Sequence, residues 1–145
     1  MSGIGVVAQR SRLRAALDTI PAVRRGLANI ATYMILDDHD VTDDWNLHQE
    51  WQDTVYHRPL GRRMVQNAMS SYAVFQGWGN APDRFAPGTA GGSLLHLIAS
   101  WRGGASEAAS IQARLGMPGS TGRDEAVRWD YQVDTPAYQV VVLDT

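Results

Sequence analysis

The stretch TYMILDDHDVTDDWN, residues 32–46, turns abruptly from apolar to acidic. Residues 32–36 are β-branched, aromatic or aliphatic without polar alternation, which is typical of a short buried strand. The next eight residues, 37–44, hold five aspartates and one histidine. We therefore expect a buried strand over 32–36 that delivers residues 37–40 into a loop without regular structure. In open α/β sheets, ligands bind at such strand ends.

The crowded carboxylates of this loop allow two interpretations. Aspartates so close together repel one another unless a cation neutralises them. Their hard oxygens suit calcium, magnesium, manganese or iron, and the imidazole of His39 suits transition metals or acid–base chemistry. The alternative is a solvated turn in which Asp43 or Asp44 caps the next helix and interacts with its N-terminal dipole. Residue chemistry alone leaves both interpretations open.

The composition narrows the class of protein. The 145 residues are 44% hydrophobic and 19% charged, which is the profile of one globular domain. The net charge of -2 and the scattered arginines provide no nucleic-acid-binding patch. Disulfides and thiolate chemistry are excluded because the chain has no cysteine. No apolar run is long enough to cross a bilayer and no signal peptide is visible, so the chain as written is expected in the cytoplasm.

Apolar spacing predicts several helices. Residues 12–31 carry apolar side chains every three or four positions, with Pro21 ending or kinking the first helix. Pro59 suits the first position of a helix that reaches about residue 76, with Arg62, Arg63 and Gln66 turned outward. The stripe that this helix is expected to bury comprises Leu60, Met64, Ala68, Tyr72 and Phe75.

The rest of the sequence predicts shorter helices and a pair of strands. Helices are expected over 47–58, over 94–101 with Ser93 as its N-cap, and over 106–115, while the glycine- and proline-rich residues 77–92 are expected to be loop. His48 and His57 should lie at the surface, and His96 should be packed. Residues 126–133 and 138–145 predict a strand pair around a turn at 134–137, with the second strand buried.

The order of helices, strand, helices and strand pair predicts an α/β fold. Three strands are few for a sheet that helices cover on both faces. We therefore expect the chain to be part of a larger domain.

The acidic motif and its surroundings resemble a known family. TYMILDDHDVTDDWNL, followed by PLGRRMVQNAMSSYAVFQGWGN, resembles the PhoD-like phosphatases of the metallophosphatase (calcineurin-like) superfamily. WDYQVDTPAYQVVVLDT is similar to a later stretch of the same family. The resemblance covers about residues 12–80 and 128–145 and leaves 81–127 as a variable helical and loop insertion. It implies a single incomplete domain over 1–145, with part of a metallophosphatase-type β-sandwich and flanking helices.

The resemblance also implies roles for the motif. Asp38 falls where the family has a residue that ligates a metal and contacts the phosphate of a phosphate-ester substrate. His39 falls on the histidine that assists protonation of the leaving group, and Asp40 on the acidic residue that orients it. Asp37 fills a glycine position, where it shapes the turn or adds a metal ligand. The implied cofactors are divalent or trivalent ions, with calcium, iron or manganese as candidates.

The sequence therefore allows three functions. The family's other metal ligands lie outside the matched segments, so we expect a truncated phosphohydrolase domain that is inactive alone. The first alternative is a non-catalytic remnant that binds a divalent cation through Asp37, Asp38 and Asp40. The second is an interaction module whose five tryptophans form a contact surface.

Overall fold

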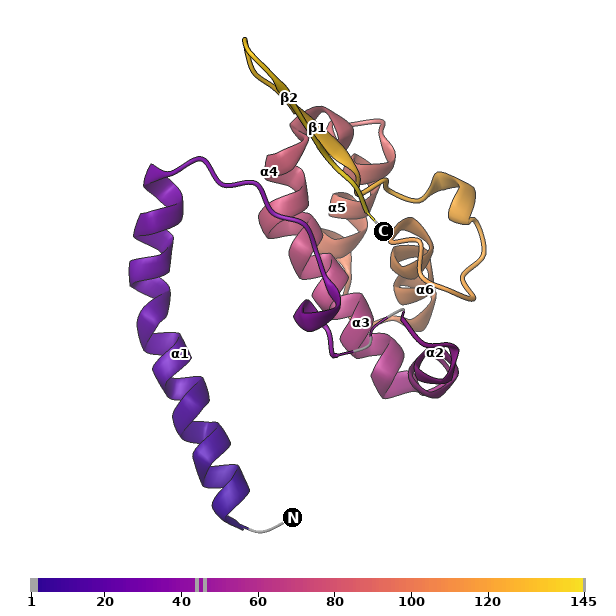
Figure 1. Ribbon diagram of the computed structural model, residues 1–145. Helices are drawn as coiled ribbons and strands as arrows, with labels where there is room; N and C mark the ends of the chain where they lie inside the picture. The colour runs from indigo at the N-terminus through magenta and orange to yellow at the C-terminus, as the bar shows by residue number, and fades with distance from the viewer. Residues whose placement is uncertain (1–2, 44, 46, 145) are drawn as a thin grey trace. The chain divides into compact units, whose positions relative to one another are not determined.

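The computed structural model describes residues 3–43, 45 and 47–144, and the chain divides into two units, Met1–Thr32 and Tyr33–Thr145 (Figure 1). In the first unit α1 (Gly3–Asn29) is one helix with Pro21 inside it, so the prediction that Pro21 ends a helix was wrong. Proline removes one backbone hydrogen bond, but the alanines, leucines and arginines on either side favour the helix strongly enough to continue it. Its apolar side chains are exposed: Leu13, Leu17, Ile20, Val23 and Leu27.

The second unit is mainly helical (Figure 1). Its α-helices are α2 (Gln49–Tyr56), α3 (Pro59–Tyr72), α4 (Trp78–Asn80), α5 (Ala90–Ser100) and α6 (Ala105–Arg114). A π-helical turn, η2 (Ala73–Gly77), joins α3 to α4. The described residues also form the 3-10 turns η1 (Asp38–Asp40), η3 (Pro82–Phe85) and η4 (Arg123–Glu125).

The residues at which α3 and α5 begin are determined by a proline and by a capping threonine. Pro59 is the first residue of α3, as predicted, because its missing N–H falls where no intrahelical partner exists. The N-cap of α5 is Thr89 and not Ser93, since the Thr89 hydroxyl accepts a hydrogen bond from the Gly92 N–H at 3.1 Å. Part of the segment 77–92 is therefore helical, and only the remainder is loop, contrary to the expectation.

The buried face of α3 differs from the predicted one. Tyr72 is buried, but Leu60, Met64 and Phe75 are exposed by 73%, 53% and 83%. The face turned inward instead carries Val65, Gln66, Met69 and Tyr72. This face lies about one residue further round the helix than the predicted stripe.

Arginines account for that rotation. The Arg62 guanidinium donates to Gln112 Oε1 at 2.8 and 3.1 Å and to the Pro118 carbonyl at 2.8 Å. The Arg63 guanidinium lies 4.3 Å from the ring centre of Trp101. Both side chains thus lie against α6 and the end of α5 with their polar groups paired, which a pattern of apolar residues alone does not anticipate.

The core of this unit lies between α3, α5, α6 and the segments around them. Gln66 is its one buried polar side chain among the described residues, and it accepts a hydrogen bond from Gln112 Nε2 at 2.9 Å. The apolar members with the least exposure are Val65, Leu94, Ile111, Leu115 and Met117.

A two-stranded hairpin is the only sheet in the described part of the chain. β1 (Tyr131–Asp134) pairs antiparallel with β2 (Gln139–Val142), and Tyr131 is opposite Val142. A strand pair around the predicted turn is confirmed, but β1 begins at Tyr131 and not at residue 126, and β2 is largely exposed and not buried. Residues 32–36 form neither a strand nor a helix. The α/β prediction, with a partial metallophosphatase-type β-sandwich, was therefore wrong, because a hairpin against helices replaces the sheet.

The three histidines outside the acidic turn are at the surface. His48 and His57 are exposed, as predicted, but His96 is exposed as well, so its predicted packing was wrong. Among the described residues, every helix is too short or too polar to traverse a lipid bilayer.

Candidate metal centre

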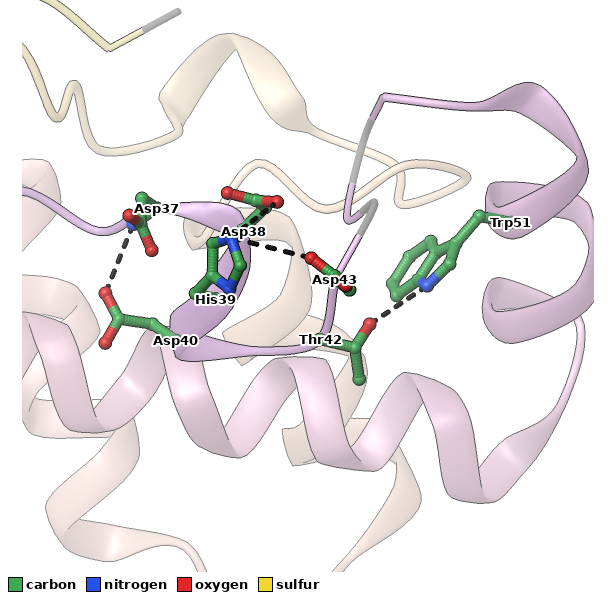
Figure 2. A network of polar contacts seen from close by, with 7 residues as sticks. All are labelled: Asp37, Asp38, His39, Asp40, Thr42, Asp43 and Trp51. Carbon is green, nitrogen blue, oxygen red and sulfur yellow. Dashed lines mark hydrogen bonds and ion pairs between the residues drawn. The ribbon is translucent and has the colours of Figure 1, made fainter.

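The acidic loop forms a single turn of 3-10 helix, η1. The Asp40 N–H donates to the Asp37 carbonyl at 3.3 Å, and the Val41 N–H donates to the Asp38 carbonyl at 3.0 Å. The Asp40 carboxylate turns back and accepts the Asp37 N–H at 3.2 Å (Figure 2). The expectation of a loop without regular structure was wrong because short aspartate side chains bond to nearby backbone groups and close the turn.

His39 lies between two carboxylates (Figure 2). Its Nε2 is 3.8 Å from Asp38 Oδ2 and 3.5 Å from Asp43 Oδ1. His39 and Asp43 are four residues apart, a spacing that brings the two side chains together across the turn. The three side chains each offer one ligand atom, and these atoms lie within 4.8 Å of one another. We call this group the Asp38–His39–Asp43 cluster.

The cluster fits one cation by its chemistry and spacing. A metal bound at about 2.0–2.2 Å from oxygen and nitrogen ligands holds neighbouring ligand atoms about 3–4 Å apart. Both measured distances from His39 Nε2 fall in that interval. The side chain of Asp38 is 24% exposed, whereas His39 and Asp43 are 72% and 83% exposed. Such exposure leaves room for water ligands and predicts weak binding, since little of the site is preorganised.

The chain leading into the turn is anchored at Met34. Its carbonyl oxygen accepts hydrogen bonds from Asn80 Nδ2 at 2.6 Å, from the Tyr131 hydroxyl at 3.1 Å and from the Tyr72 hydroxyl at 3.2 Å. The Met34 N–H donates to Asn80 Oδ1 at 3.4 Å. The backbone groups of Met34 are therefore paired with side chains and not with a neighbouring strand.

The two tyrosines are suited to act as donors. Tyr72 and Tyr131 are each 4% exposed. Burial, and then the neighbouring Tyr131, raise the pKa of Tyr72 to about 12. Burial also raises the pKa of Tyr131. Both hydroxyls consequently keep their protons, and their hydrogen bonds to Met34, throughout the physiological range.

Tryptophans hold the chain after the turn. Trp45 is buried, and its Nε1 donates to the Tyr56 hydroxyl at 3.0 Å. Trp51 Nε1 donates to Thr42 Oγ1 at 2.9 Å (Figure 2). The acidic turn is thus fixed at both ends by α2, α3 and α4, although the carboxylates themselves face solvent.

A groove of about 900 Å³ adjoins the turn and is lined by residues on either side of it, Leu36 and Trp45. Its other walls include Met69 and Trp129, and its carboxylates are Asp124 and Asp144. No basic side chain is among its described lining residues. The groove therefore does not favour a phosphate group unless a cation offsets the negative charge.

The structure separates the predicted site residues into two groups. Asp38 and His39 lie in the cluster, whereas Asp37 and Asp40 bond to each other and close the turn. Asp43 was assigned helix capping, but α2 begins at Gln49 with His48 at its N-cap, and Asp43 contacts His39. The spacing of four residues between His39 and Asp43 was the signal that sequence analysis missed. The other signature positions, Asp44 and Asn46, lie outside the described residues.

No family model, curated protein or solved structure matches this chain. The likeness to PhoD-like phosphatases is therefore carried by the residues of the motif and its neighbours alone.

Proposed function

We propose that the chain carries part of the metal site of a PhoD-like, metal-dependent phosphohydrolase, centred on Asp38 and His39. The observation that carries the proposal is the Asp38–His39–Asp43 cluster, in which an imidazole lies between two carboxylates. The two carboxylates of the cluster suit manganese, iron or calcium and leave His39 able to carry a proton. A bound cation would supply the charge that stabilises a phosphoryl group during hydrolysis.

Asp38 and His39 would have different roles, one in binding the cation and one in donating a proton. Asp38 is the less exposed carboxylate and is proposed to hold the cation and, through it, the phosphate. His39 is proposed to hold a proton at Nε2 and to donate it to the leaving oxygen of the ester. The same nitrogen cannot bind a metal and carry that proton at once. The loss of His39 should therefore remove turnover while leaving most of the cation affinity.

Asp43 is proposed to hold the cation together with Asp38, and the resemblance gives the role of orienting His39 to Asp40. In the structure the Asp40 carboxylate bonds to the Asp37 N–H, whereas Asp43 Oδ1 lies 3.5 Å from His39 Nε2. Asp37 and Asp40 then act by shaping the turn.

The number of metal ligands decides between a catalytic two-metal site and a site that only binds a cation. A two-metal phosphoesterase holds its ions about 3.5–4 Å apart, which takes more ligands than one turn provides. Among the described residues, the Asp38–His39–Asp43 cluster is the single group of this kind. We therefore expect the 145-residue chain to bind a cation without appreciable turnover. This count also supports the second candidate function, a non-catalytic cation site.

Hydrolysis assays distinguish the two candidates. The substrates are p-nitrophenyl phosphate and bis(p-nitrophenyl) phosphate, with calcium, manganese and iron supplied in turn. They are tested on this chain and on the longest open reading frame that contains it. Metal-dependent hydrolysis by the longer protein, lost in Asp38→Asn and His39→Ala and kept in the surface control His48→Ala, supports the phosphohydrolase. Cation binding without hydrolysis in either protein supports the non-catalytic site, and the absence of both contradicts the proposal.

A further inference from the structure

Asp43 is the most exposed member of the Asp38–His39–Asp43 cluster, so its position depends on the chain beside it. Its side chain is 83% exposed, whereas that of Asp38 is 24% exposed. Asp43 lies outside η1, and the hydrogen bond that closes this turn joins Asp37 to Asp40. The 3.5 Å approach of Asp43 Oδ1 to His39 Nε2 therefore depends on contacts of the residues after the turn.

Thr42, the residue before Asp43, is held by two hydrogen bonds. Trp51 Nε1 donates to the Thr42 hydroxyl at 2.9 Å (Figure 2). The Thr42 carbonyl accepts the Trp45 N–H at 3.1 Å. Both the side chain and the backbone of Thr42 are thus bound, and both donors are tryptophans that lie later in the sequence.

These tryptophans are fixed in turn by Tyr56 at the end of α2. The Trp51 ring meets the Tyr56 ring edge-on, with 5.7 Å between the ring centroids and 82° between the ring planes. Trp45 is buried, and its Nε1 donates to the Tyr56 hydroxyl at 3.0 Å. The Arg62 guanidinium of α3 lies 5.9 Å from the centre of the Tyr56 ring. Trp51 therefore has a defined position from which its N–H reaches Thr42.

The hydrogen bond between Trp51 and Thr42 is better suited to ordering the site than to stabilising the fold. It lies at the surface, where water can replace either partner, so its net contribution to folding is small. A ligand that is already in place when the cation arrives loses less conformational freedom on binding. We propose that Trp51 and Thr42 are positioning residues of the candidate metal centre, which hold Asp43 where it can bind the cation. This role rests on the proposed function, in which Asp43 is a ligand, and neither residue contacts the cation itself.

Variants of Thr42 separate the effect of its hydroxyl from that of its shape. Thr42→Val removes the acceptor and keeps the β-branch, whereas Thr42→Ser keeps the hydroxyl. The dissociation constant for Mn²⁺ is measured from the electron paramagnetic resonance signal of the free ion, under conditions where circular dichroism shows every variant folded. Thr42→Val should raise this constant by about 2–10-fold, the change that corresponds to one net hydrogen bond. Thr42→Ser should bind Mn²⁺ like the wild-type chain.

Trp51→Phe tests the donor of the same hydrogen bond. It removes the N–H and keeps an aromatic ring against Tyr56, so the Mn²⁺ dissociation constant should rise as in Thr42→Val. The double variant should bind no more weakly than either single variant, because both changes remove one interaction. Trp101→Phe is the matched control, since Trp101 Nε1 donates to the Gly104 carbonyl at 3.2 Å after the end of α5. This control should leave Mn²⁺ binding unchanged.

The Asp43→Asn background distinguishes positioning from a general loss of structure. Asp43→Asn should itself weaken Mn²⁺ binding, and adding Thr42→Val should then cause no further loss, because the charged ligand that Thr42 positions is gone. A purely structural role would weaken binding equally in both backgrounds, and that result overturns the proposal.

Other results overturn the proposal at separate points. Wild-type affinity in Thr42→Val or in Trp51→Phe shows that their hydrogen bond does not order the site. Equal weakening in Thr42→Ser and Thr42→Val shows that the hydroxyl is not the acting group. A wild-type chain that does not bind Mn²⁺ contradicts the proposed function itself, and the positioning role with it.

Discussion

Asn80 holds the backbone of Met34 by both of its polar groups, since Asn80 Nδ2 lies 2.6 Å from the Met34 carbonyl oxygen and the Met34 N–H lies 3.4 Å from Asn80 Oδ1. Asn80 ends α4, and Met34 lies three residues before the acidic turn. This contact therefore connects the helical part of the unit to the candidate metal centre.

Replacing Asn80 should destabilise the second unit and loosen the approach to the turn. Asn80→Ala should lower the free energy of unfolding by about 1 kcal/mol, because the Met34 N–H loses its acceptor while the Met34 carbonyl keeps the Tyr72 and Tyr131 hydroxyls as donors. Asn80→Asp keeps the shape and the acceptor but loses the amide donor, so at neutral pH it should be at least as damaging. Urea unfolding followed by tryptophan fluorescence gives the free energies. A fully stable Asn80→Asp protein would show that the donor does not matter.

Alkaline pH should weaken the same contact. The pKa of Tyr72 is raised from 10.0 to about 12 in the folded protein, so the stabilisation is complete below pH 10 and is lost as the pH rises towards 12. The chain contains no lysine and no cysteine, so tyrosines dominate side-chain titration in this interval. The loss should approach about 2–3 kcal/mol at most.

Urea midpoints measured between pH 8 and pH 11 test this dependence. In Tyr72→Phe the fall in stability with pH should become shallower. Some slope should remain, because the pKa of Tyr131 is also raised. An identical slope in Tyr72→Phe and the wild-type protein would contradict the assignment to Tyr72.

Arg62 should be a major stabilising residue despite its charge. Its guanidinium donates to Gln112, to the Pro118 carbonyl and to Ser120 Oγ at 3.2 Å. Arg62→Ala should lower the free energy of unfolding by about 1.5–3 kcal/mol, and Arg62→Lys should recover little, because one ammonium cannot reproduce the planar fork. Arg58→Ala, at an exposed N-cap, is the matched control and should change stability far less. Equal effects at the two positions would contradict this reading.

These contacts also show what the sequence could and could not predict. Pro59 at the start of α3 and the turn around Pro136 follow from local chemistry, and both were predicted correctly. The run 32–36 was mistaken for a strand because its residues favour extended structure, whereas its partners are side chains 38, 46 and 97 residues away from Met34. Sequence spacing carries no information about such distant donors.

The candidate site was predicted in the same uneven way. Asp38 and His39 were singled out from the clustered charge and the family resemblance; their side chains lie 3.8 Å apart, and their roles stay predictions. Asp43 was missed because its position beside His39 depends on the 3-10 turn that Asp37 and Asp40 close. The buried face of α3 was missed for a related reason, since paired arginines replaced apolar side chains at its margin.

Under the proposed phosphohydrolase function, His39 should donate the proton and Asp38 should bind the metal. His39→Ala should slow hydrolysis by about 10²–10⁴-fold, the usual range for a positioned general acid, with manganese affinity largely kept. Asp38→Asn should lose both affinity and turnover. Steady-state kinetics combined with calorimetric titration of manganese separates the two effects. Loss of manganese binding in His39→Ala would show that the imidazole is a ligand and not the acid.

The most direct test of the candidate metal centre is paramagnetic broadening of the imidazole NMR signals by Mn²⁺. The chain has four histidines, and the exposed His48, His57 and His96 serve as internal controls for nonspecific contact with the ion. We predict that substoichiometric Mn²⁺ broadens the signals of His39 first, and that Asp38→Asn combined with Asp43→Asn removes this preference. Equal broadening of all four histidines, or unchanged preference for His39 in the double variant, would contradict a cation site at the Asp38–His39–Asp43 cluster.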